Sequence, residues 1–279
     1  MDKPAGVTSH DVVGMLRRRL GERRIGHAGT LDPSATGVLV VGVGHVTRLL
    51  RFVTEGTKRY SGEVVLGVAT DSLDADGAVT ATFDMAPVDL EVVRAVVADH
   101  LTGVIQQIPP MVSALKVDGR RLHELAREGI EVERQPRTVT VERFDVLGAS
   151  RDGDGREVLS IDVTCSAGTY IRTLAADLGS LLGGGAHLRH LRRTMVAPFS
   201  IDEAAPPEIC ELLAPAAAVR SLTTIVADDE LAARIANGAV LDAPEGEGPW
   251  AYLDDVGDVL AVYEDHRGGL AKPAVVIPR

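Results

Sequence analysis

The sequence predicts an α+β fold in which a large domain is followed by a small β-rich one. The chain has 279 residues, which is more than a single domain usually holds. Helical and strand-like apolar patterns are mixed along its length. Alanine and proline dominate residues 204–215, where the charge balance also changes. These observations together indicate a domain boundary near residues 204–215.

The elements of the large domain follow from apolar periodicity and turn residues. A hydroxyl at Thr8 or Ser9 can cap a helix that runs to Leu20. Residues 38–43 form a continuous apolar, β-branched run, which indicates one buried strand. Further elements are expected as a short helix at 45–53, a strand at 58–70, a turn at 74–77, a helix at 88–101, paired strands at 138–147 and 157–166, a helix at 170–182 and an extended segment at 186–200.

Two regions complete the expected topology. Residues 108–136 give no simple pattern, apart from a basic and partly helical centre at 120–127. The small C-terminal domain is expected to hold a helix at 228–236 and short strands at 251–253, 259–263 and 274–277.

Composition narrows the class of protein. With 45% hydrophobic and 25% charged residues, the chain can bury a sizeable core. No apolar segment approaches the roughly 20 residues of a membrane-spanning helix, and the polar start does not resemble a signal peptide. Cys165 and Cys210 lie far apart, and Cys165 is expected to be a buried thiol. A reducing cytoplasm fits this usage, and no metal site is expected.

The charge is unevenly distributed along the chain. The net charge is −11, but 15 acidic and only 5 basic residues lie from residue 201 onward, so residues 1–200 are almost neutral. Basic residues cluster there, and a polyanion responds to such a local patch. The clusters can equally be solvated helix faces. They are found at 17–19 with 23–24, at 58–59, at 120–121 and at 189 with 192–193.

Residues 26–37 form the most informative stretch. They hold a single carboxylate, Asp32, among small residues that include three glycines. Small residues let another chain approach the loop closely, and Pro33 biases Asp32 toward an extended backbone. An acid on a tight loop beside a buried strand suits a rigid active site. Asp-Pro also commonly begins an ordinary turn, so both interpretations stay open.

Separated blocks of sequence carry a resemblance to a known family. They are residues 2–9, the Asp32 loop, residues 58–60 and residues 168–172, with a fifth block at 109–121 that includes residues 113–116. In this order the blocks resemble the TruB family of bacterial tRNA pseudouridine synthases. The resemblance implies a catalytic domain at 1–210 with a mixed, largely antiparallel central sheet flanked by helices. It also implies an RNA-gripping insertion at about 107–137 and a small PUA-like domain at 222–279. The acidity of that last domain argues against strong phosphate binding, so it either contacts only the acceptor arm or mainly packs on the catalytic domain.

The resemblance also implies a reaction. Such enzymes flip one T-arm uridine of tRNA, uridine-55, out of its stack and isomerise it to pseudouridine. The expected partner is tRNA, with no membrane, no metal and no organic cofactor, and the chain is expected to act as a cytoplasmic monomer. By motif match Asp32 is the nucleophile, Arg172 pairs with it and Tyr60 stacks on the flipped base. From the residues alone, Arg172 could instead be a surface helix charge and Tyr60 a core residue.

Four further residues match family positions that bind substrate. His27 would fill the space that the flipped base leaves, although a lone histidine is usually structural. Tyr170 and Leu191 would contact the nucleotide, although Tyr170 could equally pack its helix. Lys3 would reach a phosphate or support the Asp32 loop.

Other classes of function are weighed against this one. A non-catalytic tRNA-binding or RNA-folding module would not need Asp32. An aspartyl phosphotransferase of the haloacid dehalogenase type would need a second acid where Ser34 stands. A glycoside hydrolase would need a second carboxylate, and none lies near Asp32 in the sequence.

Overall fold

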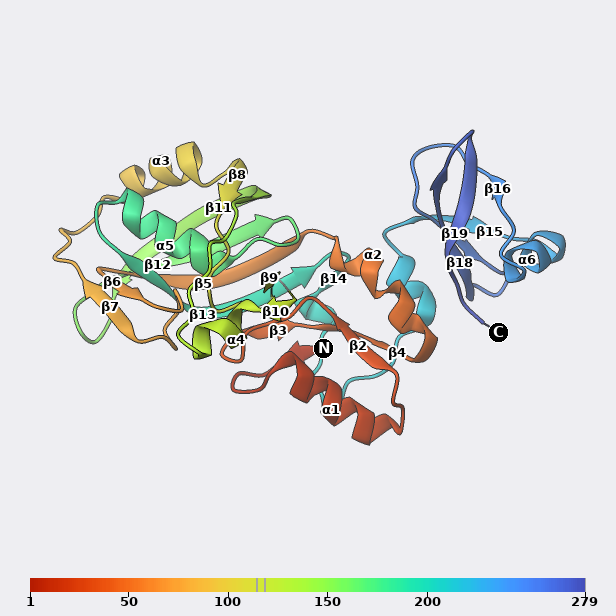
Figure 1. The fold of residues 1–279 in the computed structure, drawn as a ribbon, viewed down its shortest axis with the longest axis horizontal. Coiled ribbons are helices and arrows are strands. Elements are labelled where there is room, and N and C mark those ends of the chain that lie inside the picture. The colour runs from red at the N-terminus through yellow and green to blue at the C-terminus, as the bar shows by residue number, and fades with distance from the viewer. Residues whose placement is uncertain (114, 118, 279) are drawn as a thin grey trace. The chain divides into compact units, whose positions relative to one another are not determined.

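The computed structural model describes residues 1–113, 115–117 and 119–278, and it divides into two compact units (Figure 1). The first unit comprises Met1–Leu31, Val38–Gly56 and Val196–Arg279. The second unit comprises Asp32–Gly37 and Thr57–Met195. These units are defined by contacts within the structure, whereas the domains expected at 1–210 and 222–279 come from the sequence resemblance. The expected domains therefore stay a prediction.

The N-terminal part of the first unit begins with the expected helix. Thr8 caps it, because its hydroxyl oxygen accepts from the amide of Asp11 at 3.0 Å, and the Asp11 carboxylate accepts from the amide of Thr8 at 2.8 Å. Gly21 ends it with a left-handed backbone. The elements here are β1 (Asp2–Lys3), α1 (Ser9–Leu20), β2 (Ile25–Ala28), β4 (Val40–Val43), the 3-10 helix η1 (Gly44–Leu49) and α2 (Leu50–Thr54).

The expected single strand at 38–43 is wrong. The chain instead forms β3 (Thr36–Val38) and β4, which pairs with β2, and Leu39 separates them. Leu39 is fully buried, and its amide donates to the carbonyl of Met1 at 2.8 Å. An unbroken apolar run does not reveal such a change of partner, because every residue in it is suited to burial.

The C-terminal part of the first unit is β-rich, as expected. Its sheet has the order β15-β17-β18-β19-β16, and Trp250 and Tyr263 are fully buried in it. The sheet packs on η1 and α2 through Leu49, with Val219 and Val262 in the same buried cluster. The elements are β14 (Phe199–Ser200), η2 (Ile201–Glu203), η3 (Pro215–Val219), β15 (Thr223–Val226), α6 (Asp229–Ala236), β16 (Leu241–Asp242), β17 (Trp250–Leu253), β18 (Val259–His266) and β19 (Leu270–Val276).

The second unit is built on a mixed, largely antiparallel sheet, which confirms the expected fold class. The order within this unit is β3-β13-β5-β12-β11-β8, and the β13–β3 pair is parallel. Helices α3 and α5 lie over one face of the sheet (Figure 1). The bounds are β5 (Lys58–Leu66), α3 (Leu90–His100), β8 (Gly103–Gln107), β11 (Arg137–Arg151), β12 (Glu157–Cys165), α5 (Ile171–Leu181) and β13 (Ala186–Val196).

The remaining elements of the second unit are short. The expected strand at 58–70 is interrupted at Gly67, whose φ of +84° ends β5 and starts a separate hairpin of β6 (Val68–Thr70) and β7 (Val79–Thr82). The expected helical centre of the insertion is confirmed. Residues 120–127 form β10 (Arg120–Arg121) and α4 (Leu122–Arg127), and β10 pairs with β9 (Lys116–Val117). Ala114, which belongs to the fifth sequence block, lies outside the described residues.

The Asp32 loop is joined to β13 by an unusually close backbone approach. Thr36 and Gly37 pair with Arg192 and Arg193. A Cβ at Gly37 would lie 2.1 Å from the carbonyl oxygen of Arg193, and the φ of Gly37 is +103°. Only glycine therefore fits between the loop and the strand.

We expect Gly37→Ala to lower the free energy of unfolding by about 2–3 kcal/mol, because it adds both a backbone clash and a disfavoured φ. Urea denaturation would measure the change. Gly148→Ala is a matched control, because Gly148 lies on β11 with nothing within 4 Å of the added Cβ. Equal stability of the two variants would show that the close approach is not required.

Candidate active site

The start of α5 carries Arg172 into the interior of the second unit. The helix begins at Ile171, directly after Tyr170. The buried amide of Gln107 holds the backbone of Tyr170 at both ends, donating to its carbonyl at 3.1 Å and accepting from its N–H at 2.7 Å. The side chain of Arg172, in the first turn, is only 5% exposed. The interpretation of Arg172 as a surface helix charge is therefore wrong.

The Arg172 guanidinium is shared by two carboxylates. Its Nε lies 3.2 Å from Oδ2 of Asp32, and its Nη2 lies 3.3 Å from Oδ1 of the same residue. Its Nη1 lies 3.1 Å from Oδ2 of Asp74. It also donates to the backbone carbonyls of Ser72 at 2.9 Å and Val112 at 2.7 Å. These partners compensate a buried charge that would otherwise be strongly unfavourable.

Asp32 is the more accessible of the two acids. Its side chain is 39% exposed, against 14% for Asp74. The carbonyl of Asp32 accepts from the amide of Ala35 at 3.1 Å, so the loop is also a turn. The two interpretations of the Asp-Pro sequence are thus compatible. Its backbone forms a turn while its carboxylate pairs with Arg172.

Sequence reasoning missed Asp74. The sequence indicates only a turn at 74–77, and nothing in the sequence connects Asp74 with Arg172. In the structure, the Asp74 carboxylate accepts from the hydroxyl of Ser72 and from the amide of Asp76 at 3.1 Å. The Thr70 hydroxyl donates to the carbonyl of Asp74 at 2.7 Å. Asp74 is therefore held rigidly while it pairs with Arg172.

Tyr60 lies on β5 in a buried, cationic neighbourhood. It is 7% exposed, and its hydroxyl is hydrogen-bonded to the guanidinium of Arg193, itself 1% exposed. Burial raises the pKa of the Tyr60 hydroxyl, and the neighbouring charge of Arg193 partly opposes that rise. Burial also lowers the pKa of Lys58 to about 8, with Arg193 contributing. The expected burial of the Cys165 thiol is confirmed, and that burial raises its pKa to about 11.

The remaining predicted site residues are divided between the two units. Tyr170 and Leu191 belong to the second unit and are half-buried; a Cβ at Gly62 would lie 3.6 Å from Cδ1 of Leu191. His27 belongs to β2 of the first unit, where its ring meets that of His10 edge-on at 6.0 Å between centroids.

Lys3 also belongs to the first unit, and it is fully buried. Its ammonium donates to the carbonyls of Pro4 at 2.9 Å and Val7 at 2.7 Å. This burial leaves no ammonium exposed to a phosphate. These bonds support the turn that precedes α1, and the expected support of the Asp32 loop by Lys3 stays a prediction.

Several of the basic clusters are paired with carboxylates. Arg59 meets Asp162 at 2.8 Å, and Arg189 meets Glu63 at 2.8 Å. Arg120 pairs with Glu128. These arginines are partly exposed, so the pairs contribute little to stability and leave the cations accessible to an anionic partner.

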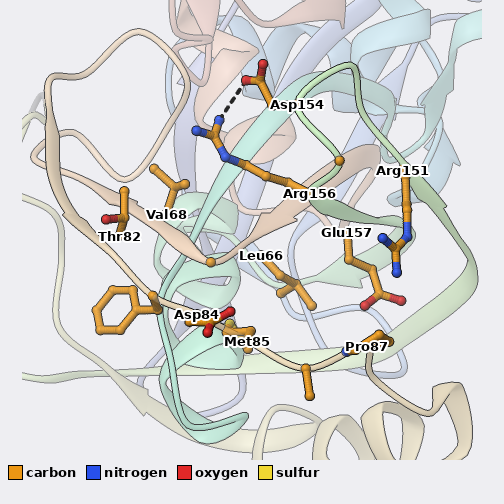
Figure 2. A pocket seen from close by; sticks show the side chains of 14 residues that line it. Leu66, Val68, Thr82, Asp84, Met85, Pro87, Arg151, Asp154, Arg156 and Glu157 are labelled. Atoms are coloured by element: carbon orange, nitrogen blue, oxygen red, sulfur yellow. Dashed lines mark hydrogen bonds and ion pairs between the residues drawn. The ribbon is translucent and has the colours of Figure 1, made fainter.

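A cavity of about 420 Å³ opens elsewhere in the second unit (Figure 2). It lies between the segment that follows β7 and the tip of the β11–β12 hairpin. Leu66, Val68 and Met85 form its apolar part, and Arg151 and Arg156 lie at its polar side. None of the predicted site residues lines it. Within the described ranges there is no cluster of potential metal ligands and no helix long and apolar enough to cross a membrane.

Comparison with known proteins identifies the family. Residues 17–171 match the model of the TruB family pseudouridylate synthase N-terminal domain. Residues 172–222 match the tRNA pseudouridylate synthase B C-terminal domain. The chain belongs to the TruB family of pseudouridylate synthases. The resemblance seen in the sequence is thereby confirmed, and the chain is a pseudouridine synthase.

Full-length relatives agree with this membership of the TruB family, and solved structures share the fold. The tRNA pseudouridine synthase B of Corynebacterium aurimucosum is 45% identical, with 100% of this chain and 95% of that protein covered. The enzyme of the same name from Rhodococcus jostii is 46% identical, with coverage of 99% and 92%. The fold resembles a Cbf5-Nop10-Gar1 complex structure (TM-score 0.72, 26% identity, 100% and 82% covered). It also resembles an H/ACA RNP bound to a substrate RNA that contains 2'-deoxyuridine (TM-score 0.73, 24% identity, 100% and 84% covered).

Asp74→Asn should remove one of the two carboxylates that compensate buried Arg172. We expect the free energy of unfolding to fall by about 2–4 kcal/mol, as measured by urea denaturation. Asp76→Asn, in the same turn but exposed, should change stability by less than about 0.5 kcal/mol. An Asp74→Asn protein as stable as this control would contradict the pairing.

The lowered pKa of Lys58 makes stability depend on pH. Between about 8 and 10.5 the unfolded chain binds more protons at this residue than the folded one, so the stability of the wild type rises with pH in that window. Lys58→Met lacks this titration, so its stability relative to the wild type should be greater at pH 7 than above pH 10.5, by about 3 kcal/mol. This relative stability should fall as the pH rises above 8. A difference in denaturation midpoint that stays constant from pH 7 to pH 10 would contradict the lowered pKa.

Proposed function

We propose that the chain isomerises the T-arm uridine of tRNA to pseudouridine, with Asp32 as the nucleophile. The pairing of Asp32 with the buried guanidinium of Arg172 carries this proposal, because it presents one partly exposed carboxylate in a fixed orientation. Family membership and the tRNA pseudouridine synthase B relatives support tRNA as the substrate. They do not favour a non-catalytic tRNA-binding module.

The main requirement of the reaction is one carboxylate that the protein holds in a fixed position. The bond between N1 of uracil and C1′ of ribose breaks, and a bond between C5 and C1′ forms. The proton on C5 leaves, and N1 gains one, so the product is an isomer of the substrate. A carboxylate that adds to the base or the sugar can hold the separated fragments while uracil turns. The exposed edge of Asp32 meets that need, while Arg172 holds its other side.

The other predicted residues have supporting roles in this proposal. The uridine must leave its stack, and a ring in the pocket recovers part of that energy, about 1–3 kcal/mol for one base. Tyr60 supplies the ring, and the hydrogen bond from Arg193 limits where it can move. Tyr170 and Leu191 contact the nucleotide, and His27 occupies the place that the base leaves. The proposal includes a cytoplasmic monomer with a catalytic domain at 1–210, a PUA-like domain at 222–279 and no metal or organic cofactor.

The test is pseudouridine mapping on unmodified tRNA incubated with the purified chain. Asp32→Asn should abolish product while the Kd for tRNA stays within about threefold of the wild-type value, since phosphate contacts dominate affinity. Asp99→Asn, at an exposed position of α3, is the control and should keep full activity. Full activity of Asp32→Asn would reject Asp32 as the nucleophile. Product at a uridine outside the T arm would reject the proposed substrate position.

A further inference from the structure

Leu73 and His190 share an unusual backbone conformation. In the described parts of the chain they are the non-glycine residues with positive φ, at 64° and 55°. The left-handed region is uncommon for residues with a Cβ: histidine adopts it more often than most, whereas a bulky residue such as leucine is an outlier there. Residues with such strain tend to occur at functional sites, where the surrounding structure holds them in place.

Leu73 and the first half of β13 hold the turn that carries Asp74. The amide of Leu188 donates to the carbonyl of Leu73 at 3.0 Å, and the amide of Ala75 donates to the carbonyl of Leu188 at 2.9 Å. Asp74 forms a parallel bridge with Leu188 between these two bonds. The turn is therefore fixed to β13 just before His190.

The second half of β13 holds the loop that carries Asp32. Arg192 pairs with Thr36, and Arg193 pairs with Gly37. A guanidinium N–H of Arg192 also donates to the Thr36 hydroxyl at 3.3 Å. The same strand thus fixes both loops, with His190 between the two points of attachment.

The side chain of His190 does not explain its conformation. It is 72% exposed, and its Nε2 lies 3.9 Å from the nearest Glu63 oxygen, which is beyond hydrogen-bond distance. The backbone has a clearer consequence. Successive side chains of a strand point to opposite faces, so a change of conformation at one residue would turn Leu191 and shift Arg192 relative to Leu188.

We propose that the left-handed backbones of His190 and Leu73 set the relative position of Asp32 and Asp74 across Arg172. Both are positioning residues for the reaction, and the inference rests on the proposed function. If His190 relaxed to an ordinary strand conformation, the Asp32 loop would move relative to the Asp74 turn. One guanidinium could then no longer meet both carboxylates.

The experiment is a series of variants at His190 that differ in their tolerance of left-handed backbone. Asn and Gly adopt it readily, Ala less so, and Val least. We expect His190→Asn and His190→Gly to keep kcat within about twofold of the wild type. His190→Val should lower kcat by about tenfold or more with KM for tRNA unchanged, because a small misplacement of reacting groups strongly slows a reaction. His190→Ala should be intermediate, and it serves in place of the valine variant if that protein does not fold.

A second series of variants, at Leu73, tests the same proposal at the turn that carries Asp74. Leu73→Asn should retain kcat, and Leu73→Val should lower it. Circular dichroism and thermal denaturation establish that each variant is folded, so that kcat refers to native protein.

Two results would overturn the proposal. Equal loss of activity in Asn, Gly and Val variants at His190 would assign the effect to the imidazole. Full kcat in all folded variants at both positions would show that neither backbone positions the site. Failure of the proposed function is distinct from both, because it would appear as full activity of Asp32→Asn or as product at a uridine outside the T arm of tRNA.

Discussion

One buried guanidinium, shared by two carboxylates, is the interaction on which the site depends. Arg172 is almost inaccessible to water, so its charge requires Asp32 and Asp74 on either side. The three residues come from the Asp32 loop, the turn after β6 and the first turn of α5. Each is held by its own backbone contacts, through Gly37, Leu188 and Gln107 respectively. The site is thus a property of the whole sheet rather than of one loop.

This arrangement explains how a partly exposed acid can stay fixed. An isolated aspartate on a glycine-containing loop would sample many orientations. The planar guanidinium of Arg172 meets both oxygens of Asp32 and leaves more than a third of the side chain accessible. Asp74 occupies the remaining side of the guanidinium, which keeps Arg172 from following Asp32 outward.

Sequence patterns predicted the helices and strands whose formation depends on residues close together in the chain. The helix capped by Thr8, the paired strands β11 and β12, and the β-rich C-terminal segment follow from capping, alternation and turn residues. The breaks at Leu39 and Gly67 were missed, because each occurs where the backbone changes the segment with which it pairs. Motif blocks singled out Asp32 and Arg172. Asp74 was not found, because its part in the site arises only when the turn binds β13 and brings it to Arg172.

A double-mutant cycle on kcat tests most directly whether the two carboxylates and the guanidinium act as one unit. The four proteins are the wild type, Asp74→Asn, Arg172→Lys and the double variant, each assayed for pseudouridine formation on the same tRNA. If the residues act together, the double variant should be no slower than the worse single variant, because either change alone already disrupts the shared arrangement. Losses that multiply in the double variant would show that Asp74 and Arg172 act independently, and they would contradict the account.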